Sequence, residues 1–182
     1  MKIFFAIMAF RDERLDVLFR LISKDEIEAA VGIFLGIGMV ALVSKSIDDN
    51  FLLAPFGATS IIAFLKYDSE FAQPRNIILG YLITSVVGVL TVYMLGHNWF
   101  SYALGVAIAM LIKVQCNAVH PPSAAMPIIL IQIKESTMIG YLIYEAMPGL
   151  VLLVAVAIIY NRYILHKDYP LWRSKISEVE KS

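Results

Sequence analysis

Two short apolar stretches of the chain contain prolines and residues suited to binding a small anion. They are FLLAPFGATSIIAFL, residues 51–65, and PPSAAMPIILIQI, residues 121–133. Proline is favoured in the first turn of a helix and disfavoured beyond it. Each stretch is therefore expected to enter as extended chain and to continue as a half-helix, one from Pro55 and the other from Pro121. As straight helices they would cover only about 20–22 Å of a bilayer core of about 30 Å.

A helix that begins inside a membrane leaves its first backbone N–H groups without partners in the helix. The helix dipole adds about half a positive charge at the same end. Lipid cannot satisfy these donors, so water or an anion must do so. Two such ends that meet near the midplane suit a small anion better than a cation. The alternative is a pair of proline-kinked helices that pack together and bind nothing.

Candidate anion-binding residues lie at these two breaks. His120 precedes the second half-helix, where its ring can donate to an anion, gain a proton near neutral pH, or simply brace the break. Gly57 allows the backbone to approach a ligand or a neighbouring helix. Thr59 and Ser123 offer hydroxyl donors, although such hydroxyls often bond to their own backbone. The full candidate set is Pro55, Phe56, Gly57, Ala58, Thr59, Asn117, His120, Pro121, Pro122, Ser123 and Ala124.

Two charged residues are candidates for gating or coupling. Arg75 follows Pro74 at the start of a long apolar segment, where an arginine opposes the helix dipole. It either guides anions at the inner mouth or extends to lipid phosphate. Glu145 lies about two turns inside the last segment, and an intramembrane carboxyl group is costly. We expect Glu145 to couple transport to protons or to pair with Lys113 or His120; the alternative is that it reaches the nearby interface.

The composition indicates a chain whose solvent is lipid. Of the 182 residues, 59% are hydrophobic and 16% are charged. Fifteen basic and fifteen acidic residues leave no net charge, which argues against a nucleic-acid partner. One cysteine and three scattered histidines predict no metal site and no cofactor. No nucleophile lies beside a base, so an enzyme is not expected.

The elements that must position the candidate residues are helices. Residues 1–25 form an amphipathic segment, which lies either on the membrane surface or against the protein itself. The sequence Ser23-Lys24-Asp25-Glu26 fits a capping box, so a helix should begin there. Residues 26–161 form the transmembrane domain, and residues 162–182 a polar cytoplasmic tail. The four long apolar segments are Ile27–Val43, Ile77–Leu95, Trp99–Ile112 with an extension to Gln115, and Ile139–Tyr160.

The two halves of the domain match each other in order, as repeat 1 at residues 27–95 and repeat 2 at residues 99–161. Each match pairs small residues, prolines or aromatic residues in the same sequence order. The matches are Leu35-Gly36 with Leu104-Gly105, Pro55 and Ala58 with Pro121 and Ala124, and Gly80-Tyr81-Leu82-Ile83 with Gly140-Tyr141-Leu142-Ile143. The fold predicted is an all-α membrane protein with two repeats of helix, interrupted segment and helix.

The topology has two alternatives. If the interrupted segments cross, there are six membrane segments and the repeats are inverted, as in many transporters. If they are re-entrant, there are four spans and two half-helices. Both termini are basic, which places both in the cytoplasm. The four-span scheme leaves its inner loop, residues 96–98, without lysine or arginine, whereas the six-segment scheme places Lys66, Arg75 and Lys113 inside; six segments are therefore favoured.

Three short motifs resemble the signatures of the HPP family of integral membrane proteins. They are PFGA at 55–58, AQPRN at 72–76 and HPP at 120–122, and the resemblance covers roughly residues 27–160. The chain departs from the family where Ser123-Ala124-Ala125 stands in place of the usual Ala-Gly-Ala. Members in chloroplasts and cyanobacteria act in nitrite transport, so the resemblance implies nitrite or a similar anion as substrate.

The function expected from the sequence is a permease for a small inorganic anion, with nitrite first. The alternative is a non-transporting membrane scaffold or subunit, in which the interrupted helices pack together and bind no anion. The expected location is a bacterial inner membrane with both termini in the cytoplasm. The expected partners are the anion and the lipid bilayer, and a homo-oligomer is left open.

Overall fold

The computed structural model of the chain describes residues 22–47 and 52–171. The amphipathic N-terminal segment, except for its last residues, and the tail beyond residue 171 lie outside the described residues. Within them every regular element is helical, as the sequence predicts. In chain order these elements are α2 Lys24–Ser46, α3 Ala54–Leu65, η1 Glu70–Ala72, α4 Pro74–Leu95, α5 Trp99–Gln115, η2 Pro121–Ala124, α6 Ala125–Gln132, α7 Glu135–Gly140, η3 Tyr141–Ala146, α8 Met147–Ile158 and η4 Ile159–Ile164.

Helix length and composition fit a membrane. In the described part of the chain, three helices are long and apolar enough to cross one: α2, α4 and the continuous helix Glu135–Ile164 that includes α7, η3, α8 and η4. Helix α5 has 17 residues and ends at Gln115, so the expected extension of the third apolar segment is confirmed. Helix α3 has 12 residues and is too short to span the core alone.

The helix starts follow local sequence signals. Ser23 and Glu26 form the predicted capping box: the Glu26 N–H donates to Ser23 Oγ at 3.2 Å, and the Ser23 N–H donates to Glu26 Oε2 at 2.7 Å. Before α3, Leu53 is extended at φ −101° and ψ 142°. Before η2, His120 is extended at φ −136° and ψ 103°. Both interrupted segments therefore begin as extended chain and become helical at their prolines, as expected.

Small residues bring the helices close together. Gly32 and Gly36 of α2 both face the Phe64 ring of α3, so close that no Cβ would fit without a shift of that ring. At Gly88 of α4 an added Cβ would lie 2.9 Å from the Pro127 Cα of α6. These glycines thus allow close packing of the helices, which is the usual role of small residues between membrane helices.

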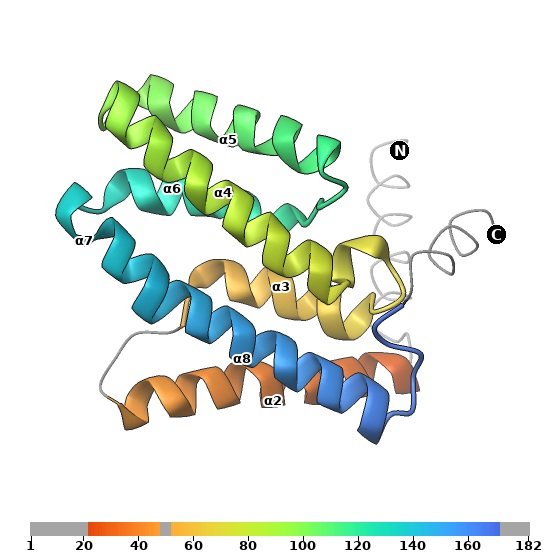
Figure 1. Cartoon of the computed structure of the whole chain (residues 1–182). Coiled ribbons are helices and arrows are strands. Elements are labelled where there is room, and N and C mark those ends of the chain that lie inside the picture. Colours follow the sequence, from red (N-terminus) through yellow and green to blue (C-terminus); the bar gives the residue numbers. More distant parts are fainter. Residues whose placement is uncertain (1–21, 48–51, 172–182) are drawn as a thin grey trace, which may run out of the picture.

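The helices alternate in direction along the bundle (Figure 1), and the start of α2 lies at the same end as the finish of η4. Helix α2 packs against α3 and α8, and α5 packs against α6 and α4. Each interrupted helix also contacts the last long helix of the other half, α3 with α8 and α6 with α4. The two halves therefore make corresponding contacts with each other, which agrees with a relation between them. That they are inverted repeats stays a prediction.

Candidate functional site

A group of buried polar residues lies where the second break meets α3, α4 and α5. We call it the break cluster, and its members are Thr59, Tyr81, Lys113, His120 and Ser123. None of these side chains is more than 3% exposed. The cluster joins two sequence-predicted site residues of repeat 2, His120 and Ser123, to Thr59 of repeat 1. The two breaks, 61 residues apart at this contact, therefore meet inside the protein.

His120 is the centre of a hydrogen-bonded chain whose proton positions follow from its partners. Its Nδ1 lies 2.7 Å from the Phe71 carbonyl, which can only accept, so Nδ1 carries the proton. The Nε2 of the neutral ring then accepts from Thr59 Oγ1 at 2.9 Å. Thr59 Oγ1 in turn accepts from the Tyr81 hydroxyl at 2.9 Å. Both ring nitrogens are engaged, so His120 braces the break and the neutral ring has no N–H left for an anion.

Lys113 is the charged member of the break cluster. Its Nζ donates to the His120 carbonyl at 3.2 Å and to Ser123 Oγ at 3.1 Å. The side chain is 3% exposed. In the described part of the chain, no ion pair links Lys113 to a carboxylate. From the sequence, Lys113 is expected only on the inner side of the membrane or as a partner of Glu145, so its position in the break cluster is a finding of the structure.

A sequence signal for the burial of Lys113 does exist. The residues of α5 that face the protein are Ser101, Gly105, Ala109 and Lys113. They are four positions apart and so share one face of the helix. A lysine in register with three small residues is expected on the packed face, whereas the lipid-facing side of α5 carries large apolar residues.

The second break offers few backbone donors. Pro121 and Pro122 have no N–H, and the Ser123 N–H donates to the His120 carbonyl at 3.2 Å. The expected set of free N–H groups at this helix start is therefore largely absent. The positive charge at this end comes from the Lys113 ammonium instead.

Gly80 of α4 makes room for the break cluster. An added Cβ would lie 3.0 Å from His120 Cβ, 3.2 Å from the Ala118 carbonyl oxygen and 3.2 Å from Ser123 Oγ. Such distances are tighter than normal packing, so the backbone of α4 approaches the break as only glycine allows. From the sequence, Gly80 is noted only in the match between the two repeats and is not connected with the site.

At the first break, one face of α3 packs against the break cluster. Pro55, Phe56 and Thr59 are buried, and the Phe56 ring meets the Tyr81 ring edge-on at 5.8 Å between centroids. Gly57 and Ala58 are exposed, and nothing lies within 4 Å of a Cβ placed on Gly57. The expected approach of a neighbouring helix to Gly57 is therefore wrong, because this residue is on the outer face of α3.

Arg75 holds the loop that leads into the second break. Its guanidinium donates to the Asn117 carbonyl at 2.7 Å and to the Cys116 carbonyl at 3.3 Å. Asn117 has a positive φ of 47° in this loop, is exposed, and offers its carbonyl to Arg75. An arginine at the carboxyl end of α5 complements the dipole of that helix. Arg75 is itself exposed, so this bracing is compatible with a position at the inner mouth.

The other polar residues of the AQPRN motif fix the turn before α4. Gln73 Nε2 donates to the carbonyls of Tyr67 and Ser69, at 3.0 and 2.8 Å. Asn76 Nδ2 donates to the Glu70 carbonyl at 2.9 Å. These amides satisfy backbone groups of an irregular segment that lipid could not satisfy. The motif therefore has a structural role at this end of the bundle.

Glu145 lies apart from the break cluster. It is half-buried in a π-helical turn, Tyr141–Ala146, immediately before α8. The turn has a local cause: Pro148 has no N–H to complete an α-helical bond to the Tyr144 carbonyl, and its ring crowds the preceding turn. Glu145 is not among the hydrogen-bond partners given above for His120 and Lys113, and its role in coupling or pairing stays a prediction.

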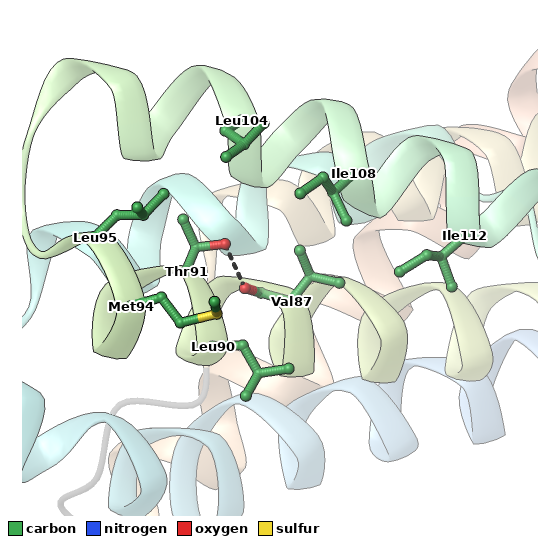
Figure 2. A pocket seen from close by; sticks show the side chains of 8 residues that line it. All are labelled: Val87, Leu90, Thr91, Met94, Leu95, Leu104, Ile108 and Ile112. Atoms are coloured by element: carbon green, nitrogen blue, oxygen red, sulfur yellow. Dashed lines mark hydrogen bonds between the residues drawn. The ribbon is translucent and has the colours of Figure 1, made fainter.

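A hollow of about 300 Å³ lies between α4 and α5 (Figure 2). The hydroxyl of Thr91 is the one polar side-chain group of its lining, and it donates to the Val87 carbonyl of its own helix at 2.7 Å. An apolar wall offers an anion no donor, so this hollow is not the anion site. Its lining is Val87, Leu90, Thr91, Met94, Leu95, Leu104, Ile108 and Ile112.

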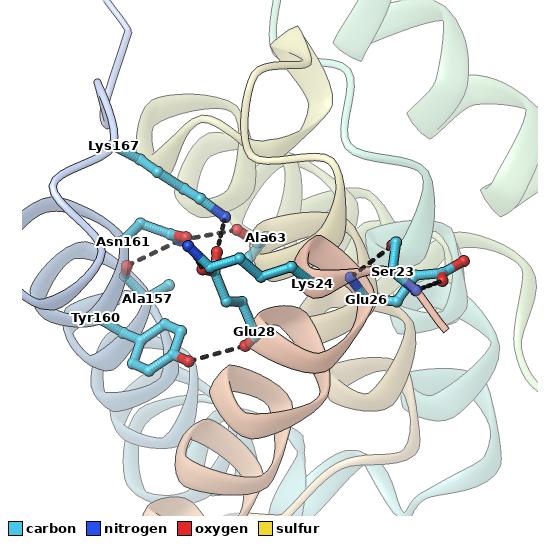
Figure 3. Close-up of polar contacts among 9 residues, drawn as sticks. All are labelled: Ser23, Lys24, Glu26, Glu28, Ala63, Ala157, Tyr160, Asn161 and Lys167. Atoms are coloured by element: carbon cyan, nitrogen blue, oxygen red, sulfur yellow. Dashed lines mark hydrogen bonds and ion pairs between the residues drawn. The ribbon is translucent and has the colours of Figure 1, made fainter. Parts of the chain in front are cut away.

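A second polar group lies at the end of the bundle where α2 begins (Figure 3), and we call its charged residues, Glu28, Lys167 and Lys24, the terminal ion pair. Lys167 Nζ lies 3.0 Å from Glu28 Oε2, and Lys24 Nζ lies 3.5 Å from Glu28 Oε1. The Tyr160 hydroxyl donates to the Glu28 carbonyl at 2.8 Å. Asn161 Nδ2 donates to the Ala63 carbonyl of α3 at 3.0 Å. These contacts fasten α2, α3 and the end of the last helix together.

Comparison with known proteins agrees with the motifs. A family model described as HPP, transmembrane region, matches residues 20–170. Two transmembrane proteins of Dictyostelium discoideum are each 28% identical over 149 residues, which is 76% of this chain and 52% and 48% of theirs. The chain thus spans about half the length of the curated relatives it matches. No solved structure matches it.

Proposed function

The chain belongs to the HPP family of integral membrane proteins, and on this premise we propose that it is a permease for a small inorganic anion, with nitrite as the first candidate. One observation carries the proposal. The residue before the second interrupted helix, His120, is hydrogen-bonded inside the protein to Thr59 in the second turn of α3, so the two breaks are in direct contact. Irregular backbone at membrane depth is tolerated where it is buried in protein or lines a water-filled path.

The break cluster supplies the polarity that an anion path needs. Hydroxyl groups from Thr59, Tyr81 and Ser123 and one ammonium group lie together, each on a residue that is no more than 3% exposed. Ionisable residues within membrane segments are costly to bury and commonly mark substrate or ion pathways. This distribution supports transport over a purely structural use of the breaks.

A non-transporting scaffold or subunit remains the second candidate. The observation in its favour is that both ring nitrogens of His120 already have partners within the protein. A break that is fully satisfied by its own side chains is stable without any ligand. No enzymatic role is proposed.

Purified protein in liposomes distinguishes the two candidates. We expect nitrite flux that depends on the protein and that saturates, in a panel of nitrite, nitrate, formate and bicarbonate. Failure of every anion to cross would favour the scaffold.

In the same assay Glu145→Gln tests coupling: if Glu145 carries the proton, this variant should still bind nitrite but should no longer respond to a pH gradient. Unchanged gradient-driven uptake would return Glu145 to a structural role.

We also propose that the protein resides in a bacterial plasma membrane with both termini in the cytoplasm. The alternating helix directions (Figure 1) support six membrane segments over four. Topology reporters fused after residues 49 and 70 should then report opposite faces of the membrane. Reporters on one face would instead require re-entrant half-helices.

A further inference from the structure

The break cluster contains a positive charge without a matching negative one. The Lys113 side chain is 3% exposed, and its two hydrogen-bond partners, the His120 carbonyl and Ser123 Oγ, are neutral. No salt bridge to Lys113 exists in the described ranges, residues 22–47 and 52–171. Buried ammonium groups in proteins are paired because desolvation of an isolated charge is expensive. Among the residues that the structure describes, Lys113 therefore lacks the counter-charge that its burial requires.

The cluster also contains more donors than acceptors. The His120 carbonyl oxygen receives the Ser123 N–H at 3.2 Å, the Ser123 hydroxyl at 2.7 Å and the Lys113 ammonium at 3.2 Å. A carbonyl oxygen has two lone pairs for these three donors. The ammonium has three N–H groups, and the partners above engage two of them. An additional acceptor beside Lys113 would relieve both mismatches.

The position of Lys113 in its own helix does not explain the arrangement. A lysine in the last turn of a helix commonly interacts with the final carbonyls of that helix. Here the ammonium instead bonds to His120 and Ser123, in the segment that follows α5. The side chain is therefore directed at the start of the second interrupted helix.

We propose that Lys113 binds the transported anion, with the ammonium supplying the counter-charge and Ser123 fixing its position. This inference rests on the proposed function and names the residue that would recognise the substrate. Because one lysine supplies one positive charge, the site favours a monovalent anion over phosphate or sulfate. The tight contact of Gly80 with His120 and Ser123 restricts the site to a small species such as nitrite or formate.

Neutral substitution of Lys113 tests the assignment, with Lys66→Met as the matched control because Lys66 is exposed. In liposomes, Lys113→Met should raise the KM for nitrite about ten- to a hundredfold, the effect expected for a charged hydrogen bond. Nitrite should raise the Tm of the wild type in detergent and should not raise that of Lys113→Met. Lys113→Arg, which keeps the charge, should retain part of the Tm response, and Lys66→Met all of it.

Several outcomes separate this inference from the proposed function. Nitrite flux with an unchanged KM and an unchanged Tm response in Lys113→Met would overturn the Lys113 assignment and leave the permease intact. A wild type that neither transports nor binds any anion of the panel would overturn the proposed function first. Should Lys113→Met fail to fold, Lys113→Gln replaces it, because its amide still donates hydrogen bonds without a charge. A wild-type KM in that variant also counts against the assignment.

Discussion

Two lysines of the bundle, Lys167 and Lys113, differ in how their charge is satisfied. Lys167 is 15% exposed, lies 3.0 Å from a Glu28 carboxylate oxygen, and stands 4.8 Å from the centre of the Tyr67 ring. Lys113 is buried more deeply, and its partners in the part of the chain that the structure describes are a carbonyl and a hydroxyl. The charge of Lys167 is thus balanced by a carboxylate. Lys113 is packed tightly by neutral groups, and its charge has no such partner among the described residues.

This difference separates structural from functional polarity. A paired charge near the end of a bundle joins helices and gains little from any ligand. An unpaired charge inside the bundle lowers stability unless something else neutralises it. We infer that the terminal ion pair stabilises the fold and that the break cluster binds a substrate. Substitutions at the terminal ion pair should therefore change the Tm, and substitutions at the break cluster should change nitrite transport.

The largest effect is expected for Ser123→Asp, which places a carboxylate within reach of Lys113. The introduced charge would pair with the ammonium and occupy the position of the anion, so nitrite flux should be lost while the protein folds. Ser123→Ala removes the hydroxyl that bonds to Lys113 and to the His120 carbonyl but leaves the ammonium in place, so it should weaken nitrite binding by only about 1 kcal/mol. Flux and Tm measurements on both variants provide the comparison. Equal transport by the two folded variants would show that the anion does not pass this break.

A smaller effect is expected for Gly80→Ala, which disturbs the packing of α4 against the break cluster. The new Cβ would press on His120 and Ser123, and overpacking of this kind typically costs about 1–3 kcal/mol. Gly57→Ala is the control, because its Cβ meets open space and alanine favours a helix by up to about 1 kcal/mol. Thermal unfolding in detergent should therefore shift down for the first variant and slightly up for the second. A downward shift of equal size in both would contradict the packing argument.

The smallest effect is expected at the terminal ion pair. Lys167→Met removes a partner that is 15% exposed, and Lys24→Met removes one that is 88% exposed. The first should lower the Tm slightly and the second hardly at all, because solvent screens the exposed pair. Neither variant should change the KM for nitrite. A raised KM in Lys167→Met would mean that the terminal ion pair also takes part in transport, and the distinction between the two regions would fail.

Local sequence signals were sufficient to predict most of the secondary structure. The capping box of Ser23 and Glu26, the prolines at 55 and 121, and the length of each apolar segment act within one or two helical turns. Such signals do not depend on what packs nearby, so the sequence alone determined where these helices begin and that lipid surrounds them. It also located His120, Thr59 and Ser123 as residues at the breaks.

The tertiary structure alone decided how those residues are used. The bond between His120 and Thr59 joins positions 61 residues apart, and the bond of His120 to Phe71 fixes which nitrogen carries the proton. Burial of Lys113 depends on α5 turning its small-residue face toward the protein. No residue type specifies these contacts by itself, because they arise from the close packing of four separate segments. The register of Lys113 with the small residues of α5 indicates its burial, but its contacts with His120 and Ser123 are seen only in the folded chain.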